Sequence, residues 1–469
     1  MRDLSYQGVM ARKNEIIRKA VGLDYQQFEK PDGSFDYEAL MASVPYSPER
    51  VREIQAELQV GNTPLVYLKN ISALAKKLAP EGMGAKIYMK DEALNPTGSF
   101  KARRAALSCY QAKEMGYKGV VAATSGNYGA AVAGMAAKLG LKCIVVQECF
   151  DGDHVGQPEI LEKQRKCEAL GAEVIQLSVG PELFYETLKL LEETGYYNAS
   201  LYTATAIRGI ESLGYEIVQQ SREKFGKDPD VVIATTAGGG NVTGTARGLI
   251  EAGAKDTKVY GAAVDLSGLH MASNKDFNRK SFTTGHTGFG VPFATKPDRA
   301  DVPRNAARPL RYLDRFLLLK QGEVFYITEM LAALEGLERG PAGNVSLAAA
   351  FALAKTLPED QVIVVQESEY TGAGKHPLPQ LSFAKKNGIK LAFANPDEEV
   401  PGENIIFPEH PSMIRVRDFE MFNLRRSALR NILKEMEVKD ETKAYILEEL
   451  NCDEAELEAL MEDLSKEDK

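Results

Sequence analysis

Short apolar runs rich in valine and isoleucine alternate with longer stretches of helical periodicity through the middle of the chain. These runs predict strands at residues 86–90, 119–123, 141–147, 173–177, 231–235, 258–264 and 361–366. Helical patterns at 158–170, 181–194 and 212–225 lie between them. Parallel strands read as continuous apolar runs because helices cover both of their faces. The alternation therefore predicts an α/β fold with parallel sheets between layers of helices.

The composition excludes several classes of protein. The 469 residues suffice for two or three domains, and the net charge of −9 argues against nucleic-acid binding. No apolar run approaches the ~20 residues that span a bilayer, and residues 1–6 lack the apolar segment of a secretion signal. The cysteines are odd in number with no Cys-x-x-Cys pair, and the histidines are scattered. This pattern predicts a reducing cytoplasm and no metal site.

The most informative residue is Lys101, at the end of the run Asn-Pro-Thr-Gly-Ser-Phe-Lys that follows the first predicted strand. A lysine in the first turn of a helix feels the positive end of the helix dipole, which lowers its pKa and favours the neutral amine. A neutral, partly desolvated lysine is what Schiff-base chemistry needs. The alternative, a solvated surface lysine, is the commoner one for any single lysine.

Two glycine-containing loops make the functional interpretation stronger. Residues 124–129 (Thr-Ser-Gly-Asn-Tyr-Gly) and 237–241 (Ala-Gly-Gly-Gly-Asn) each follow a predicted strand and precede a helical stretch. In this geometry, backbone N–H groups converge on an anion such as a phosphate, and glycine lets the backbone approach closely. Either loop alone is weak evidence, since glycines often merely end an element.

Together these motifs resemble the fold type II pyridoxal-phosphate enzymes, which include threonine synthase and the tryptophan synthase β chain. The resemblance implies two parallel-sheet domains with the cofactor in the cleft between them, and Lys101 as the residue that holds the cofactor covalently. It implies further cofactor contacts from Ser99, Asn127, Gly238, Gly239, Gly240, Asn241 and Thr371, with Ser368 as the second choice for the hydroxyl facing the pyridine nitrogen.

By the same resemblance the chain divides into four parts. Residues 1–59 are expected to form a helical extension, and residues 102–225 the small domain. Residues 60–101 and 226–385 together are expected to form the large cofactor-binding domain, and residues 386–469 a largely helical C-terminal extension.

Within the family, the chain resembles the branch that cleaves 2-amino-4-oxopentanoate with coenzyme A in ornithine fermentation. The resemblance is carried by the runs at residues 10–16, 95–104, 155–160, 270–273, 281–293 and 370–376. That branch implies the products acetyl-coenzyme A and D-alanine, a small α subunit as partner, and a homodimer of this β chain. Ser125, Gly126 and Tyr128 are expected to bind the substrate carboxylate through backbone N–H groups. The attacking thiolate is either coenzyme A or an enzyme cysteine, for which Cys149 is the candidate because it follows a predicted strand.

The sequence allows more than one role for several other groups of charged residues. The segment 267–316 is long, irregular and rich in cations, which is typical of a functional loop, and could meet the phosphates of coenzyme A or form a solvated or subunit-contact loop. Arg103 and Arg104 could pair with a carboxylate or be solvated. The acidic C-terminal stretch could be a partner-docking segment or a solvated helix pair.

Three other functions compete with this interpretation. A threonine-synthase-like replacement or an ammonia-lyase elimination would use the same motifs, so only the products separate them. A nicotinamide-dependent oxidoreductase would need Gly or Ala at the sixth position of the glycine motif that begins at Gly238, but position 243 is threonine. A scaffold that binds cofactor and a partner without catalysis is the third.

Overall fold

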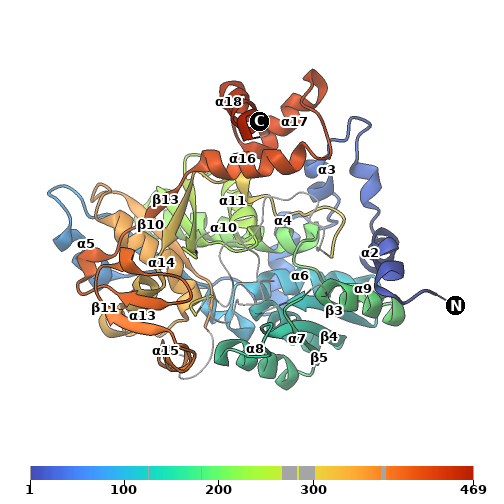
Figure 1. Ribbon diagram of the computed structural model, residues 1–469, viewed down its shortest axis with the longest axis horizontal. Coiled ribbons are helices and arrows are strands. Elements are labelled where there is room, and N and C mark those ends of the chain that lie inside the picture. The colour runs from blue at the N-terminus through green and yellow to red at the C-terminus, as the bar shows by residue number, and fades with distance from the viewer. Residues whose placement is uncertain are drawn as a thin grey trace.

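The computed structural model describes residues 2–124, 126–180, 182–266, 282–284, 301–370 and 377–467. Its larger sheet has the order β1-β2-β10-β7-β8-β9-β13 (Figure 1). The inner strands pair in parallel, whereas β1 and β13 pair antiparallel at the two edges. Its strands are β1 (Leu65–Tyr67), β2 (Lys86–Asp91), β7 (Val231–Thr235), β8 (Lys258–Val264), β9 (Arg315–Leu319), β10 (Val362–Glu367) and β13 (Arg417–Phe419).

The smaller sheet is wholly parallel and has the order β5-β4-β3-β6. Its strands are β3 (Gly119–Thr124), β4 (Lys142–Phe150), β5 (Glu173–Ser178) and β6 (Tyr197–Asn198). Strands β11 (Lys390–Phe393) and β12 (Asn404–Phe407) form a separate parallel pair.

Helices connect the strands of both sheets and extend the chain at either end. Those at the N-terminal end are α1 (Tyr6–Ala11), α2 (Lys13–Val21), α3 (Tyr37–Ala42) and α4 (Pro48–Glu57). The central helices are α5 (Lys69–Leu78), α6 (Lys101–Glu114), α7 (Asn127–Leu139), α8 (Pro158–Ala169), α9 (Glu182–Thr194), α10 (Ala204–Phe225), α11 (Gly240–Glu251), α13 (Gln321–Glu335), α14 (Pro341–Ala354) and α15 (Pro377–Lys386). At the C-terminal end, α16 (Met421–Ile432), α17 (Asp440–Leu450) and α18 (Glu454–Glu467) lie together above the larger sheet in Figure 1.

The larger sheet is buried on both faces, as parallel sheets require. Alternate residues of β7 belong to two different apolar clusters: Val232 joins the one that contains α10 and α11, whereas Ile233 joins the one that contains α13 and α14. The α/β fold with parallel sheets is confirmed. Within the described part of the chain, no helix is long and apolar enough to cross a membrane.

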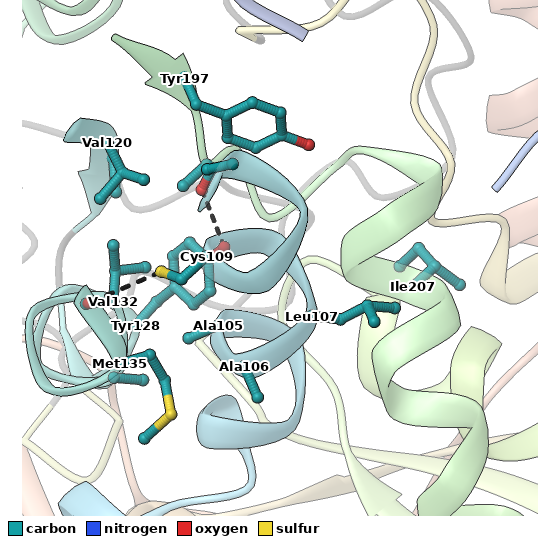
Figure 2. Close-up of a cluster of buried hydrophobic side chains, with 14 of the residues drawn as sticks. Ala105, Ala106, Leu107, Cys109, Val120, Tyr128, Val132, Met135, Tyr197 and Ile207 are labelled. Atoms are coloured by element: carbon teal, nitrogen blue, oxygen red, sulfur yellow. Dashed lines mark hydrogen bonds between the residues drawn. The ribbon is translucent and has the colours of Figure 1, made fainter. Parts of the chain in front are cut away.

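Small residues let α6 and α7 pack closely against the smaller sheet. Figure 2 shows Ala105 and Ala106 of α6 in one apolar cluster with Tyr128 and Val132 of α7. Cys109 lies in this cluster, where its Sγ is 3.8 Å from the carbonyl oxygen of Val132. Cys109 therefore fills the core, and the same cluster fixes the helix that begins at Lys101.

The apolar runs located the strands well but missed those that are short or lie in irregular surroundings. The seven predicted strands correspond to β2, β3, β4, β5, β7, β8 and β10. Strand β9 was missed, although only its first two residues fall in the segment 267–316 set aside as irregular, and α10 begins at Ala204 instead of residue 212. Strand β13 comes from the segment predicted as a mainly helical extension. The four-part division into domains stays a prediction.

A buried ionic network fixes the start of α6. The Arg103 guanidinium donates to Glu92 (Nε to Oε2, 2.7 Å) and to Glu216 of α10 (Nη2 to Oε2, 2.7 Å). Arg103 and Glu92 are wholly buried. Lys90 donates to the same Glu216 oxygen over 2.8 Å. Burial alone would raise the pKa of Glu216, but Arg103 and Lys90 outweigh it and lower that pKa to about 2.

Replacing Arg103 should destabilise the fold far more than replacing an exposed arginine. In Arg103→Leu two buried carboxylates lose their main cation, so the free energy of unfolding should fall by about 3–5 kcal/mol. Arg222→Leu is the control, because its partner Asp228 is solvent-accessible and the loss should stay below about 1 kcal/mol. Urea titration measures both values. Equal losses in the two variants would contradict the structural role of Arg103.

Candidate active site

The loop that leads to Lys101 is held in a strained and closely fitted conformation. Thr97 has φ 67°, which is unusual for a β-branched residue, and Gly98 has φ 77°. A Cβ on Gly98 would lie 2.9 Å from the carbonyl oxygen of Tyr370. Lys166 of α8 donates to the carbonyl oxygen of Thr97 over 2.6 Å. Such strain persists where the surroundings enforce it, often at functional sites.

The segment after β10 pairs with this loop along its length. Phe100 N donates to the carbonyl oxygen of Ser368 over 3.1 Å, and Tyr370 N donates to that of Gly98 over 2.7 Å. Ser99 and Glu369 form an isolated antiparallel bridge between the two segments. The chain therefore brings residues 368–370 directly beside the loop that carries Lys101.

Lys101 is the first residue of α6 and is half-buried. Burial lowers the pKa of its amine well below the ordinary value, Arg104 lowers it further, and Glu369 acts in the opposite direction. The Nζ atom lies 4.5 Å from the centroid of the Phe100 ring. The lowered pKa of Lys101 agrees with the sequence prediction. The prediction invoked the helix dipole, whereas the structure adds burial and Arg104 as causes. A neutral lysine of this kind is a competent nucleophile toward an aldehyde.

Ser99 does not act as the cap of α6. The N-cap position belongs to Phe100, and no side chain makes a capping hydrogen bond there. The Ser99 hydroxyl is wholly buried and has no partner among the described residues. A buried hydroxyl without a partner costs free energy unless a ligand satisfies it, so Ser99 Oγ is free to contact a cofactor.

Asn127 meets a buried acid that the sequence did not single out. Asn127 is the first residue of α7, and its Nδ2 donates to Oε2 of Glu369. The same oxygen lies 3.4 Å from Nζ of Lys163 on α8, and Lys163 also pairs with Glu159 over 2.5 Å. Burial raises the pKa of Glu369, while Lys163 acts against that shift. Glu369 is therefore the point where the Lys101 loop, the Asn127 loop and α8 meet.

The glycine loop after β7 has the shape of an anion cradle. Gly239 has φ 78°, a conformation that favours glycine, and α11 begins at Gly240. The N–H groups of the first helical turn have no intrahelical acceptor. Both polar atoms of the Asn241 side chain are buried without a partner among the described residues. These orphaned groups fit a phosphate, as the sequence motif predicts.

The predicted carboxylate-binding loop is described in part. Ser125 of this loop lies outside the described residues, as does Thr371, the residue predicted to face the pyridine nitrogen. Gly126 N donates to Thr124 Oγ1 over 3.1 Å. The Tyr128 side chain is buried and donates to the carbonyl oxygen of Ala199 over 2.8 Å (Figure 2). Any contact of Tyr128 with a substrate would therefore come from its backbone, as the sequence argument proposed.

Cys149 lies at the end of β4 but does not look like a nucleophile. Its side chain is wholly buried, and burial raises the pKa of its thiol to about 12, with Glu168 and Glu148 adding to the shift. Reactive thiolates form in electropositive, accessible surroundings. The thiol interacts with Cys167 on α8. The structure gives no support to this thiol as the attacking group, and its role stays a prediction.

Three cations in the irregular segment have structural roles. Arg304, Arg308 and Arg311 are buried or nearly so. Arg308 pairs with Glu449 of α17, and Arg311 pairs with the same carboxylate over 2.9 Å. Arg308 and Arg311 thus dock α17 onto the core, and Arg304 pairs with Glu29 and Glu435. All three are engaged within the chain and are not open to the phosphates of coenzyme A. Arg315, at the end of the segment, pairs with Asp418 over 2.8 Å, and the remaining lysines and arginines of segment 267–316 lie outside the described residues.

Sequence reasoning missed three charged residues of the site, namely Arg104, Lys163 and Glu369. Two weak signals were present: Arg104 follows Lys101 by three residues, and Lys163 follows Glu159 by four, so each pair shares a helix face. Glu369 gave no signal, because its partners come from α7 and α8, far away in the sequence. Within the described residues no group of histidine, cysteine and acidic side chains could hold a metal ion.

Known proteins resemble this chain over most of its length. The family model "Pyridoxal-phosphate dependent enzyme" matches residues 56–368. A protein of Acetoanaerobium sticklandii named "2-amino-4-ketopentanoate thiolase beta subunit" is 65% identical over 432 residues, covering 92% of each chain. A protein of the same name from an unknown prokaryotic organism is 62% identical over 445 residues, covering 95% of this chain and 94% of the relative. A threonine synthase of Bacillus sp. is 26% identical and covers 65% of this chain and 80% of the relative.

Solved structures of enzymes from this family share the fold. A pyridoxal 5'-phosphate-dependent aspartate racemase matches with a TM-score of 0.53 at 20% identity, covering 68% of this chain and 94% of that one. A threonine deaminase matches with a TM-score of 0.52 at 26% identity, covering 69% of this chain and 96% of that one. The fold is therefore that of the fold type II enzymes.

The lowered pKa of Lys101 should be visible in its reactivity. Acylating reagents attack only neutral amines, so trace acetylation of the cofactor-free protein should label Lys101 with a pH midpoint below the ~10.4 of a free lysine. The exposed Lys142 is the control, and peptide mass spectrometry reads both sites. If Lys101 and Lys142 shared one midpoint, the proposed neutral amine would be disproved.

Proposed function

We propose that this chain, which belongs to the family of pyridoxal-phosphate dependent enzymes, is the β subunit of a 2-amino-4-ketopentanoate thiolase. The observation that carries the proposal is Lys101, a half-buried lysine with a lowered pKa at the junction of the loops around Ser99 and Asn127. Two relatives that bear this name match more than nine-tenths of the chain, and this likeness selects the reaction within the family.

The residues of the site fit the cofactor. Lys101 would hold it covalently, the glycines 238–240 and Asn241 would receive its phosphate, and the unpartnered hydroxyl of Ser99 would contact it. Asn127, whose Nδ2 donates to Glu369, would contact the cofactor by exchanging that partner. Thr371 is proposed to face the ring nitrogen; Tyr370, the residue before it, is bonded to the Lys101 loop. When bound, pyridoxal phosphate supplies an electron sink for carbanion chemistry next to the amino group of the substrate.

The reaction is a thiolytic cleavage between C3 and C4 of 2-amino-4-ketopentanoate. The sulfur of coenzyme A bonds to the C4 carbonyl carbon, the C3–C4 bond breaks, and C3 takes up a proton. The products are acetyl-coenzyme A and alanine, which we propose to be the D-isomer. Lys101 moves protons at the substrate's α-carbon. N–H groups of the loop at Ser125, Gly126 and Tyr128 are proposed to hold the substrate carboxylate, for which the Gly126 N–H would exchange its bond to Thr124 Oγ1.

Coenzyme A itself is the better candidate for the attacking thiolate, because Cys149 is buried with a raised pKa. The variant Cys149→Ser should therefore keep thiolase activity within a few-fold of the wild type. Cys167→Ser is a matched control, since Cys167 is equally buried beside it and its pKa is also raised to about 12. Steady-state assays of acetyl-coenzyme A formation measure the effect. A loss of activity confined to Cys149→Ser would restore the enzyme thiol as the nucleophile.

The chain is proposed to act with a small α subunit and to form a homodimer in the cytoplasm. Arg304, Arg308 and Arg311 are engaged within the chain, so other groups must meet the phosphates of coenzyme A. We expect the isolated chain to bind pyridoxal phosphate but to cleave the substrate only when the α subunit is added. Product formation is followed by mass spectrometry with each component omitted in turn, and full turnover by the isolated chain would refute this dependence.

The same mixture decides between the proposal and its alternative. A threonine-synthase-like or ammonia-lyase enzyme would use Lys101 and the glycine loop equally well, and a threonine synthase is among the relatives. Acetyl-coenzyme A together with alanine supports the thiolase. An α-keto acid together with ammonia supports elimination.

A further inference from the structure

Arg104 is a buried cation to which the described part of the chain supplies no acidic partner. Its side chain is 1% exposed, and its hydrogen bond runs from Nη1 to the carbonyl oxygen of Leu201 over 3.3 Å. Its Nε is buried without a partner, and within the described residues no carboxylate forms an ion pair with it. The neighbouring Arg103 pairs with two carboxylates. A buried charge left unpaired is costly, so the surroundings of Arg104 call for an anion.

The guanidinium of Arg104 lies against the glycine loop. A Cβ placed on Gly240 would clash with Nη2 of Arg104 and lie 3.0 Å from its Cζ. Gly240 is the first residue of α11, whose twelve residues present a full helix N-terminus at this point. Asn241, the next residue, has both polar side-chain atoms buried without a partner among the described residues. A cation, an amide and helix N–H groups therefore meet at one place.

We propose that Arg104 binds the phosphate group of the cofactor, together with the glycine loop and Asn241. The inference rests on the proposed function, because it takes the ligand to be a phosphate monoester. A guanidinium presents several N–H donors in a planar fork that matches phosphate oxygens. It would complement the dipole of α11, which alone supplies about half a positive charge against a ligand of nearly two negative charges.

The same residue couples the phosphate site to Lys101. Burial is the main cause of the lowered pKa of the Lys101 amine, and the charge of Arg104 is the next largest. Burial lowers the pKa of Arg104 itself to about 10, so its guanidinium stays charged at neutral pH. Arg104 thus adds to burial in disfavouring the protonated form of Lys101 before the cofactor arrives. Its own charge is then neutralised when the phosphate binds.

The test compares pyridoxal phosphate with pyridoxal, which has the same aldehyde but no phosphate. The variant Arg104→Met keeps an unbranched side chain, shorter than that of arginine, and removes the charge and the N–H donors. Dissociation constants for both compounds are measured by absorbance titration of cofactor-free protein. Hydrogen bonds to a charged group are worth about 1.5–3 kcal/mol, so Arg104→Met should weaken pyridoxal phosphate binding about 10- to 100-fold more than pyridoxal binding. The ratio of the two dissociation constants is the readout, because both ligands react with Lys101. A change in the pKa of Lys101 therefore affects both ligands and cancels in the ratio.

Two further variants make the outcome decisive. Arg222→Met removes an exposed arginine of α10 with the same change in net charge, and its preference for the phosphorylated ligand should equal that of the wild type. Arg104→Lys keeps a charge but loses the fork, and should show an intermediate preference. Arg104→Lys also tests the proposal if Arg104→Met does not fold. Unchanged ligand preference in a folded Arg104 variant would overturn the proposal. Failure of the wild type to bind either compound would refute the proposed function instead.

Discussion

The ion pairs that join Arg103 to Glu92 and Glu216 fix the position of the candidate site. Arg103 lies two residues after Lys101, Glu92 precedes the loop that leads to Lys101, and Glu216 lies on α10. Three separate parts of the chain thus share one buried charge cluster, in which the loss of any member strands the others. The loop between Glu92 and Arg103 is anchored at both ends. This anchoring explains how Thr97 can remain at φ 67°.

Three basic residues at the start of α6 acquire different roles from their surroundings. Lys101, Arg103 and Arg104 fall within one helical turn, and each meets different groups. Arg103 meets carboxylates and becomes structural, Arg104 meets the glycine loop, and Lys101 is left half-buried with a lowered pKa. The residue type sets the available charge, whereas the partner decides what the charge does. This division lets one short helical turn serve the fold and the chemistry together.

The sequence predicted features whose cause is local and missed those whose cause is tertiary. Strands such as β7 were predictable because a buried parallel strand is a continuous apolar run, and Gly239 because its positive φ favours glycine. Strand β13 has three residues, too few for a pattern. Glu369 could not be found, since its partners Asn127 and Lys163 come from other elements. The burial of Cys149 was likewise not predictable, because the end of a strand does not reveal whether its side chain is accessible.

The balance of charge in the site follows from how each group is paired. Lys163 is held between Glu159 and Glu369, so this group of three offers little net attraction to a further anion. Burial and Arg104 disfavour the protonated form of Lys101, so its pKa lies well below the ordinary value. Arg104 is then the charge near the glycine loop that no described acid offsets. A dianionic ligand whose negative end lies at that loop matches this distribution, and its other end would be directed toward Lys101. The charges of the site therefore give an orientation to a molecule with a phosphate at one end and an aldehyde at the other.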